Sequence, residues 1–368
     1  MGDGESLVQT ELDAVTDSAV AATIVDGDWA GSEAAEPAMF APGAFLDRYV
    51  IVRHIGSGGM GVVYQAHDPE LNRQIVLKLL RVRDGHGKVG RGKTDGARVR
   101  LAREAQALAK AAHPNVVTVH GVGEVGDEVF IAMEYVPGVT LEEWSKKQPR
   151  GRKEILATFL AAGRGLAAAH RVGLVHRDFK PANVLVGDDG RVRVCDFGLA
   201  ALAQDELDPQ GRARAATDPL TATELGGRDI ALRTPVTETG ARMGTPRYMA
   251  PEQHQGKVVD ARADQFAFCA ALYGALYGEH PFVGDRYALL AISTIPGRVK
   301  DPPKGSVVPV RLRAVLLRGL RPSPDERYPS MDVLLQGLQR ETTRRSRMLA
   351  AILATALVAA TGSVALAV

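Results

Sequence analysis

The sequence of 368 residues contains few cysteines and almost no excess of charge. Cys195 and Cys269 lie among apolar residues and lack the spacing of metal ligands, so we expect reduced core residues of a cytoplasmic protein. A net charge of +2 gives no reason to expect nucleic acid as a partner. Residues 1–45 lack a basic start and an apolar run, so no secretory signal is predicted there.

The balance of charge over the whole chain conceals regions of different character. Residues 1–45 carry nine Asp or Glu and no Lys or Arg, which predicts an acidic disordered tail. Residues 46–340 alternate strand and helix signals, and we expect them to form the folded domain. The remainder is a short basic segment, 341–347, followed by 21 residues without a charge, 348–368.

A glycine-rich loop follows the first strong strand signal, which covers 49–55. Glycines let the backbone approach phosphate oxygens and present its N–H groups to them. The same G-x-G-x-x-G pattern opens a helix in dinucleotide-binding domains, but here 62–66 has the composition of a second strand. We therefore predict a hairpin turn; a glycine-rich turn without ligand is the alternative. The loop reads Gly56-Ser57-Gly58-Gly59-Met60-Gly61-Val62-Val63.

The next predicted strand, 75–80, is apolar apart from Lys78. A buried ammonium group is costly unless an anion pairs with it. Glu104 is a candidate partner, because it shares one face of a predicted helix with an apolar stripe at helical spacing. The alternative is that Glu104 flanks this stripe in solvent. The stripe consists of Leu101, Ala105, Leu108 and Ala112.

The most specific pattern follows a helical segment predicted over 155–171. It reads His176-Arg177-Asp178-Phe179-Lys180-Pro181-Ala182-Asn183, and thirteen residues after Asn183 comes Asp196-Phe197-Gly198. Two short apolar runs, 184–186 and 192–195, lie between them and are joined by a Gly-Asp-Asp-Gly turn. We therefore expect a β-hairpin with one polar ligand group at each end.

These motifs, in this order and at these spacings, resemble the eukaryotic-type (Hanks-type) protein kinase family and its bacterial membrane-anchored serine/threonine branch. The resemblance covers nearly all of 49–338. It implies a two-lobed α+β fold with ATP between the lobes. The N-lobe, 46–136, would be an antiparallel sheet with one helix, and the C-lobe, 137–340, would be mainly helical.

The resemblance also implies the roles of individual residues. Asp178 would accept the proton of a substrate hydroxyl, Lys180 would lie near the γ-phosphate, and Asn183 and Asp196 would hold Mg²⁺. Lys78 would bind the α- and β-phosphates and pair with Glu104. Glu134 and Val136 would belong to the hinge that faces adenine. The residues expected to bind ATP are Ile55, Gly56, Ser57, Gly58, Gly59, Met60, Gly61, Val63, Lys78, Glu104, Glu134 and Val136.

A second block, residues 244–252, matches the end of a kinase activation segment. By resemblance, Thr245 contacts Asp178, Glu252 pairs with Arg327, and Asp264 anchors the catalytic-loop backbone. Arg177 precedes Asp178, a pattern typical of kinases that need a phosphate on the activation loop. The candidate phosphosites are Thr237, Thr239 and Thr245; the alternative is that these are ordinary loop threonines.

The uncharged run 348–368 is long enough to cross a bilayer, at about 1.5 Å per residue and roughly 30 Å in all. Arg344, Arg345 and Arg347 precede it, so we expect a single-pass helix in the bacterial inner membrane with the kinase domain in the cytoplasm. Eight of its 21 residues are alanine, and a packing or interface helix is the alternative.

The expected activity is transfer of the γ-phosphate of ATP to Ser or Thr hydroxyls of protein substrates, with activation by autophosphorylation. A pseudokinase scaffold would lack Lys78, Asp178, Asn183 or Asp196, and all four are present. A receptor whose kinase domain only binds partners would need a sensor segment, which the sequence does not show. The resemblance also implies a homodimer formed back-to-back by the N-lobes.

Overall fold

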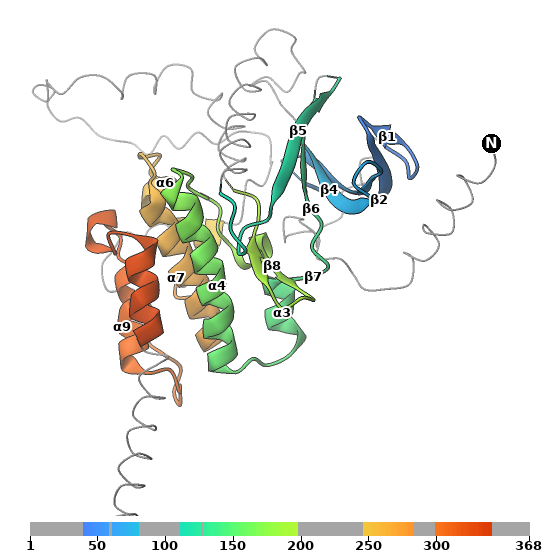
Figure 1. The fold of residues 1–368 in the computed structure, drawn as a ribbon. Coiled ribbons are helices and arrows are strands. Elements are labelled where there is room, and N and C mark those ends of the chain that lie inside the picture. The colour runs from blue at the N-terminus through green and yellow to red at the C-terminus, as the bar shows by residue number, and fades with distance from the viewer. Residues whose placement is uncertain are drawn as a thin grey trace, which may run out of the picture.

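The computed structural model describes residues 40–58, 61–80, 111–126, 128–197, 246–282 and 299–340. They form an antiparallel sheet followed by a mainly helical part (Figure 1), which confirms the predicted α+β fold class. The predicted helix around Glu104, most of the acidic tail and the run 348–368 lie outside the described residues. In the described part of the chain, no helix is both long and apolar enough to cross a membrane.

The N-terminal sheet contains six strands in the order β1-β2-β3-β4-β6-β5, and all its pairs are antiparallel. Its strands are rich in β-branched and aromatic residues, which pack well on a pleated surface. Side chains from several of the strands, including Tyr64, Ile75 and Phe130, are buried together. The strands are β1 Phe45–Leu46, β2 Tyr49–Gly58, β3 Gly61–Asp68, β4 Arg73–Leu80, β5 Val119–Val125 and β6 Glu128–Glu134.

The glycine-rich loop connects two paired strands, as predicted. Gly58 at the end of β2 lies opposite Gly61 at the start of β3. Gly61 has a φ of +143°, and a Cβ atom at this position would lie 1.7 Å from the Leu79 carbonyl oxygen on β4. Only glycine fits this approach between neighbouring strands. The motif therefore belongs to a β-hairpin and not to the strand–helix unit of a dinucleotide-binding domain.

A second, three-stranded sheet follows the N-terminal sheet, in the order β7-β8-β9. Its strands are β7 Gly138–Thr140, β8 Val184–Gly187 and β9 Val192–Val194. The helix α3, Leu141–Lys147, begins directly after β7 with a capping box: the Thr140 hydroxyl accepts from the Glu143 N–H, and Glu143 accepts from the Thr140 N–H. The predicted hairpin between Asn183 and Asp196 is thus confirmed as β8 and β9.

Long helices form most of the C-terminal part. The predicted helix 155–171 begins slightly earlier, as α4 Arg152–Arg171, and the other long helix is α7, Ala261–Tyr277. Asp260 caps α7 by accepting from the Arg262 N–H, and Gly278 ends it at a φ of +74°. The other elements are η1 Pro181–Asn183, η3 Pro246–Tyr248, α6 Pro251–His254, α9 Val310–Gly319, η4 Pro324–Glu326 and a helix over 331–340.

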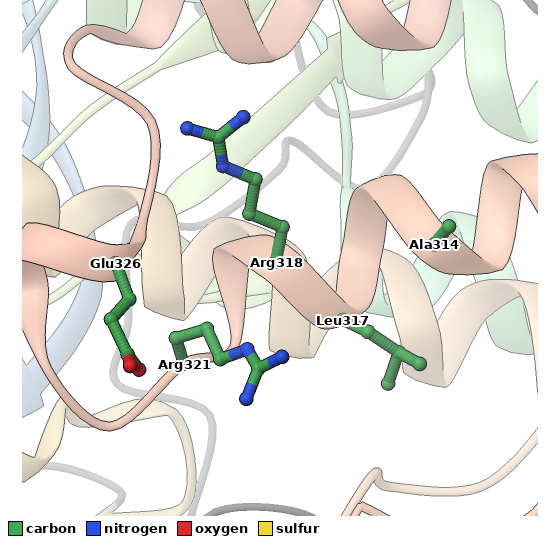
Figure 2. A pocket seen from close by; sticks show the side chains of 5 residues that line it. All are labelled: Ala314, Leu317, Arg318, Arg321 and Glu326. Carbon is green, nitrogen blue, oxygen red and sulfur yellow. The ribbon is translucent and has the colours of Figure 1, made fainter.

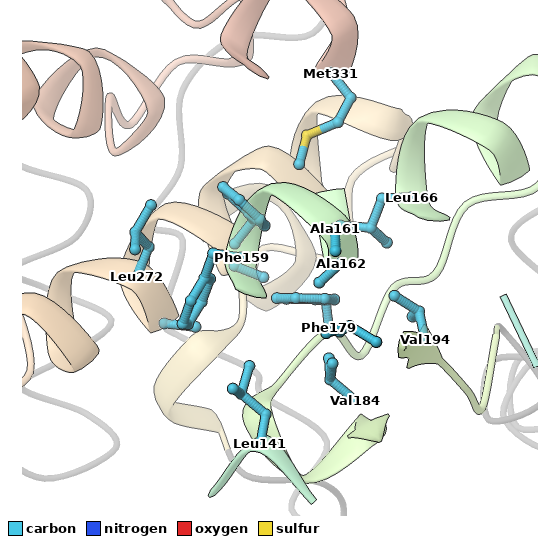
Figure 3. Close-up of a cluster of buried hydrophobic side chains, with 14 of the residues drawn as sticks. Leu141, Phe159, Ala161, Ala162, Leu166, Phe179, Val184, Val194, Leu272 and Met331 are labelled. Carbon is cyan, nitrogen blue, oxygen red and sulfur yellow. The ribbon is translucent and has the colours of Figure 1, made fainter. Parts of the chain in front are cut away.

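One hydrophobic core joins the helices to the three-stranded sheet (Figure 3). Phe159 of α4 meets Phe268 of α7 edge-to-face with 5.7 Å between ring centroids, and Phe179 lies 5.8 Å from the same Phe268 ring. Burying an aromatic or aliphatic side chain of this size contributes about 1.5–3 kcal/mol. Since Phe179 lies between Asp178 and Lys180, this packing fixes the loop that carries the candidate catalytic residues.

Candidate active site

The loop between α4 and β8 brings three of the predicted catalytic side chains together. Lys180 Nζ lies 3.3 Å from Asp178 Oδ2, and the Lys180 side chain is only 3% exposed. The Asn183 amide nitrogen donates to the Asp178 carbonyl oxygen at 2.9 Å and approaches Asp178 Oδ2 at 3.3 Å. Asp178 is thus held between a cation and an amide donor, with 23% of its side chain still open to solvent.

Asp196 follows β9 at the open end of the β8–β9 hairpin, where Asn183 precedes β8, and it faces Lys78 of β4. Lys78 Nζ is 2.9 Å from Asp196 Oδ1, and the two side chains are 5% and 15% exposed. Glu104, the predicted partner of Lys78, lies outside the described residues; within them the ion-pair partner of Lys78 is Asp196. Asp196 has a φ of +59° and Arg177 one of +65°, left-handed values that side chains other than glycine rarely adopt and that cluster at functional sites.

The donor set fits a hard divalent cation. Asp196 Oδ1 is buried and accepts no hydrogen bond from the described residues; its contact with Lys78 is ionic only. Because the Asn183 NH₂ group faces Asp178, the amide oxygen is the Asn183 atom that could face a cation. No group of three His, Cys, Asp or Glu gathers anywhere in the described part of the chain. A cation here would keep waters or bind phosphate oxygens besides one carboxylate and one amide.

Asp264, at the start of α7, holds the catalytic loop from behind. Its Oδ2 accepts from the His176 N–H and its Oδ1 from the Arg177 N–H, both at 2.8 Å. His170 Nε2 lies 2.7 Å from the same Oδ2, and Asp264 is 1% exposed. The role predicted for Asp264 is therefore visible in its hydrogen bonds.

His176 is fully buried and contributes to the packing of the loop. Its Nε2 lies 2.8 Å from the Cys195 carbonyl oxygen, which can only accept, while its Nδ1 accepts from the Asp178 N–H at 3.3 Å. This pattern assigns the neutral tautomer protonated at Nε2. The ring also lies 4.7 Å from the Phe197 ring centroid. His176 thus links the loop of Asp178 to the segment of Asp196.

The predicted pair of Glu252 and Arg327 is confirmed as a buried bidentate ion pair. The two guanidinium nitrogens lie 2.6 and 2.7 Å from the two carboxylate oxygens, and the Arg327 side chain is fully buried. Arg327 also donates to the carbonyl oxygens of Arg262, Arg321 and Pro322. These bonds connect α6, which begins within the activation-segment motif, to the start of α7 and to the segment after α9.

Sequence reasoning missed an ionic link between the hinge and the β8–β9 hairpin. Arg193 of β9 is buried and lies 3.0 Å from Glu134 Oε1 and 2.7 Å from Asp189 Oδ2. Arg193 holds the pKa of Asp189 well below its usual range. A buried cation in a three-residue apolar strand was the available signal, but nothing in the sequence indicated its distant partner Glu134.

Both thiols are buried, as predicted. Burial raises the pKa of Cys269 to about 12 and that of Cys195 well above its usual value, the latter helped by the neighbouring Asp196 charge. Such thiols remain protonated and unreactive at neutral pH. Neither cysteine therefore adds chemistry to the site.

A surface pocket lies elsewhere, on α9 and η4 (Figure 2). It has a volume of about 490 Å³ and is lined by Ala314, Leu317, Arg318, Arg321 and Glu326. None of these residues belongs to the cluster around Asp178 and Asp196. Of the predicted site residues, Gly59, Met60, Glu104, Thr237, Thr239 and Thr245 lie outside the described part of the chain.

Comparison with known proteins agrees with this arrangement. The chain is 34% identical over 300 residues to the serine/threonine-protein kinase PknB of Mycolicibacterium smegmatis, and 33% identical over 299 residues to PknB of Mycobacterium tuberculosis. In both cases the match covers 79% of this chain and 42% of the relative. The chain therefore spans less than half the length of these curated relatives.

A solved structure is similar as well. The PknI kinase domain of Mycobacterium tuberculosis matches with a TM-score of 0.57 and 28% identity, over 82% of this chain and 99% of that domain. The family model described as "Protein kinase domain" matches residues 49–336. Since this match spans most of the sequence, the chain belongs to the protein kinase family.

Proposed function

We propose that the chain transfers the γ-phosphate of ATP to Ser or Thr hydroxyls of proteins. The observation that carries this proposal is that Asp178, Lys180 and Asn183 meet the pair Lys78–Asp196 at the open end of the β8–β9 hairpin. Lys78 and Lys180 supply positive charge, Asn183 and Asp196 supply oxygen ligands for a metal, and Asp178 supplies the base. This set suits phosphoryl transfer, in which negative charge spreads over the phosphate oxygens. The serine/threonine-protein kinases to which the chain is similar support the same class of substrate.

ATP would bind between the N-terminal sheet and the catalytic loop. The glycine loop, from Ile55 through Gly61 to Val63, would cover the phosphates, and Lys78 would bind the α- and β-phosphates. Backbone groups of Glu134 and Val136 would face adenine. The Glu134 N–H donates to the Thr118 carbonyl, and Arg193 holds the Glu134 side chain, so the hinge backbone is well positioned for this role.

Asn183 and Asp196 would hold Mg²⁺, since both offer oxygen and the contact of Asp196 Oδ1 among the described residues is its ion pair with Lys78. When bound, the metal neutralises charge on the phosphates. Lys78 would then exchange its contact with Asp196 for the phosphates. Lys78 and Asp196 lie 2.9 Å apart in this structure. This proximity supports one site in which Lys78 would bind the phosphates and Asp196 would bind the cation.

Asp178 would orient the substrate hydroxyl and accept its proton as the oxygen attacks the γ-phosphorus and the bond to the bridging β–γ oxygen breaks. Lys180 lies 3.3 Å from Asp178 Oδ2 and would stabilise the transferred phosphoryl group. Phe179 and Asp264 hold the loop from the core side, so Asp178 needs little rearrangement to act.

Autophosphorylation on Thr237, Thr239 or Thr245 would activate the enzyme. These threonines lie outside the described residues, and the support comes from Arg177, an exposed cation beside Asp178 that a phosphate could neutralise. Residues 348–368 would anchor the chain in the inner membrane, with the kinase domain in the cytoplasm and a homodimer formed by the N-lobes. The uncharged run and the arginines before it support the anchor.

The test is phosphate incorporation from labelled ATP into the full chain and a generic protein substrate, for the wild type and Lys78→Met. We expect Mg²⁺-dependent phosphoserine or phosphothreonine in the wild type and a loss of about 10²-fold or more in the variant. Lys78→Arg is the matched control for charge at this position. ATP binding without transfer by the wild type would contradict the proposal and favour a kinase-like scaffold.

A further inference from the structure

The starts of two C-lobe helices meet at one end of the molecule. Arg152, the first residue of α4, donates from Nη1 to the Val307 carbonyl oxygen at 2.5 Å, and Val307 lies just before the start of α9. In Figure 1, α7 lies between α4 and α9, and it contacts both. We call the surface formed here by Arg152, Lys153, Lys304, Val307, Val310 and Arg311 the basal face.

The described chain also ends at the basal face. The helix over 331–340 runs antiparallel to α4, because its first turn contacts the end of α4: Arg171 lies 3.4 Å from Asp332. Halfway along, Gly163 of α4 packs against Leu335. The helix therefore runs from the end of α4 back toward its beginning, and Arg340 lies on the side of the basal face. The sequence continues from this point into Arg344, Arg345 and Arg347 and then into the uncharged run 348–368.

The basal face carries cations that the described residues leave unneutralised. Arg152, Lys153, Lys304 and Arg311 form no ion pair with any carboxylate in the described part of the chain. The acidic side chains around them are already occupied: Glu154 pairs with Arg150, Glu279 with Lys300 and Asp301 with Arg313. These four cations leave the described part of this face with an excess of positive charge at neutral pH.

Two valines project from the same face. Val307 is 79% exposed and Val310 is 83% exposed, more than any other large hydrophobic side chain of the described residues except Val258. Exposed apolar side chains close in sequence to exposed Lys and Arg suit the boundary between lipid headgroups and acyl chains. An acidic protein surface would explain the cations but would leave both valines without an apolar partner.

We propose that the basal face rests on the surface of an anionic phospholipid bilayer, with its cations on lipid phosphates and Val307 and Val310 at the acyl boundary. This inference builds on the proposed anchor at 348–368, which would place the bilayer beside Arg340. The 20 residues of α4 span about 30 Å from the basal face toward the catalytic loop. Lipid contact would thus hold the active site about one helix length from the membrane, facing cytoplasmic proteins.

The test uses the full chain with an environment-sensitive dye on Val307→Cys, which is selective because Cys195 and Cys269 are both buried. Vesicles of phosphatidylcholine alone are compared with vesicles that also contain phosphatidylglycerol. We expect a blue shift and an increase in dye emission with anionic vesicles only. The triple variant Lys153→Gln/Lys304→Gln/Arg311→Gln should lose most of this response, since each cation removed weakens the contact about fivefold.

The matched control is Arg164→Gln/Lys257→Gln/Arg321→Gln, which removes three exposed cations outside the basal face and should keep the response. Flotation on phosphatidylcholine vesicles reports the anchor separately, so failure of the anchor and failure of the basal face are distinguishable. Equal dye emission in both vesicle types, or an unchanged response in the first triple variant, would overturn the proposal. The face would then fit an acidic protein partner.

Discussion

The carboxylates on the two sides of the catalytic loop differ in how completely they are hydrogen-bonded. On the core side, both oxygens of Asp264 accept backbone N–H groups, and Glu252 makes a bidentate pair with Arg327. On the cleft side, Asp196 Oδ1 has an ionic contact but no hydrogen bond, and Asp178 stays partly open to solvent. Carboxylates whose hydrogen-bonding capacity is used within the protein hold the fold, whereas those with unused capacity are available to a ligand.

The backbone conformation shows the same division. Arg177 and Asp196 adopt left-handed φ values on the cleft side, and the surrounding core keeps them there through His176, which bonds to both segments. Strain of this kind persists only where the surroundings enforce it. The comparison therefore predicts that cleft-side substitutions change rate and core-side substitutions change stability.

The largest expected effect is that of Asp178→Asn. Loss of the proton acceptor should lower kcat by about 10²–10⁴-fold. The free energy of unfolding should change by less than about 0.5 kcal/mol, because the side chain is partly exposed. Steady-state kinetics and urea unfolding of the same preparation check both values. A stability loss as large as that of a core substitution would break the distinction between the two sides.

Glu252→Gln should have the largest effect on the core side. It leaves the Arg327 guanidinium buried without its counter-charge, so the free energy of unfolding should fall by about 3–5 kcal/mol. The double variant Glu252→Gln/Arg327→Met should lose less than the sum of the single variants, because no uncompensated charge remains. Additive losses in urea unfolding would show that the pair is not coupled.

Asp264→Asn should cost about 3 kcal/mol of unfolding free energy, since one backbone N–H of the catalytic loop loses a charged acceptor. The reaction rate should also fall, because Asp178 follows the loosened backbone. Asp260→Asn provides a control at the start of the same helix, where Asn caps well and only a small change is expected. Equal stability of the two variants would contradict the role of Asp264.

His280 is a buried side chain away from the cleft whose hydrogen-bonding capacity is only partly used. Its Nε2 has no hydrogen-bond partner among the described residues, and burial, with the nearby Arg247 charge, lowers its pKa to about 4. The unfolded chain takes up the proton near pH 6.5, so stability is unaffected above that pH and falls as pH drops toward 4. Between pH 7.5 and 5 the loss should be about 2 kcal/mol. His280→Gln should remove that part of the pH dependence; if it persists, another group is responsible.

Local patterns in the sequence were sufficient to predict the hairpin after Ile55 and the hairpin that connects Asn183 to Asp196. Resemblance supplied two distant pairs that the structure confirms, Glu252 with Arg327 and Asp264 with the loop backbone. The start of α4 was placed three residues late, because Arg152 and its neighbours are polar and fall outside the apolar periodicity.

Contacts between distant segments could not be derived from residue spacing. The pairs Lys78–Asp196 and Arg193–Glu134 join residues 118 and 59 positions apart. The sequence contains many other cations and carboxylates that could have formed these pairs. The roles of Glu104, the activation-segment threonines and the run 348–368 stay predictions. They concern residues outside the described part of the chain.

The most direct test of the cleft-side assignment is calorimetric titration of the full chain with ATP, with and without Mg²⁺, for the wild type and Asp196→Asn. We predict that Mg²⁺ tightens ATP binding to the wild type at least tenfold. In Asp196→Asn the two dissociation constants should converge while the protein stays folded. If the variant retained the full magnesium dependence, Asp196 would not hold the metal, and the distinction between ligand-facing and fold-holding carboxylates would fail.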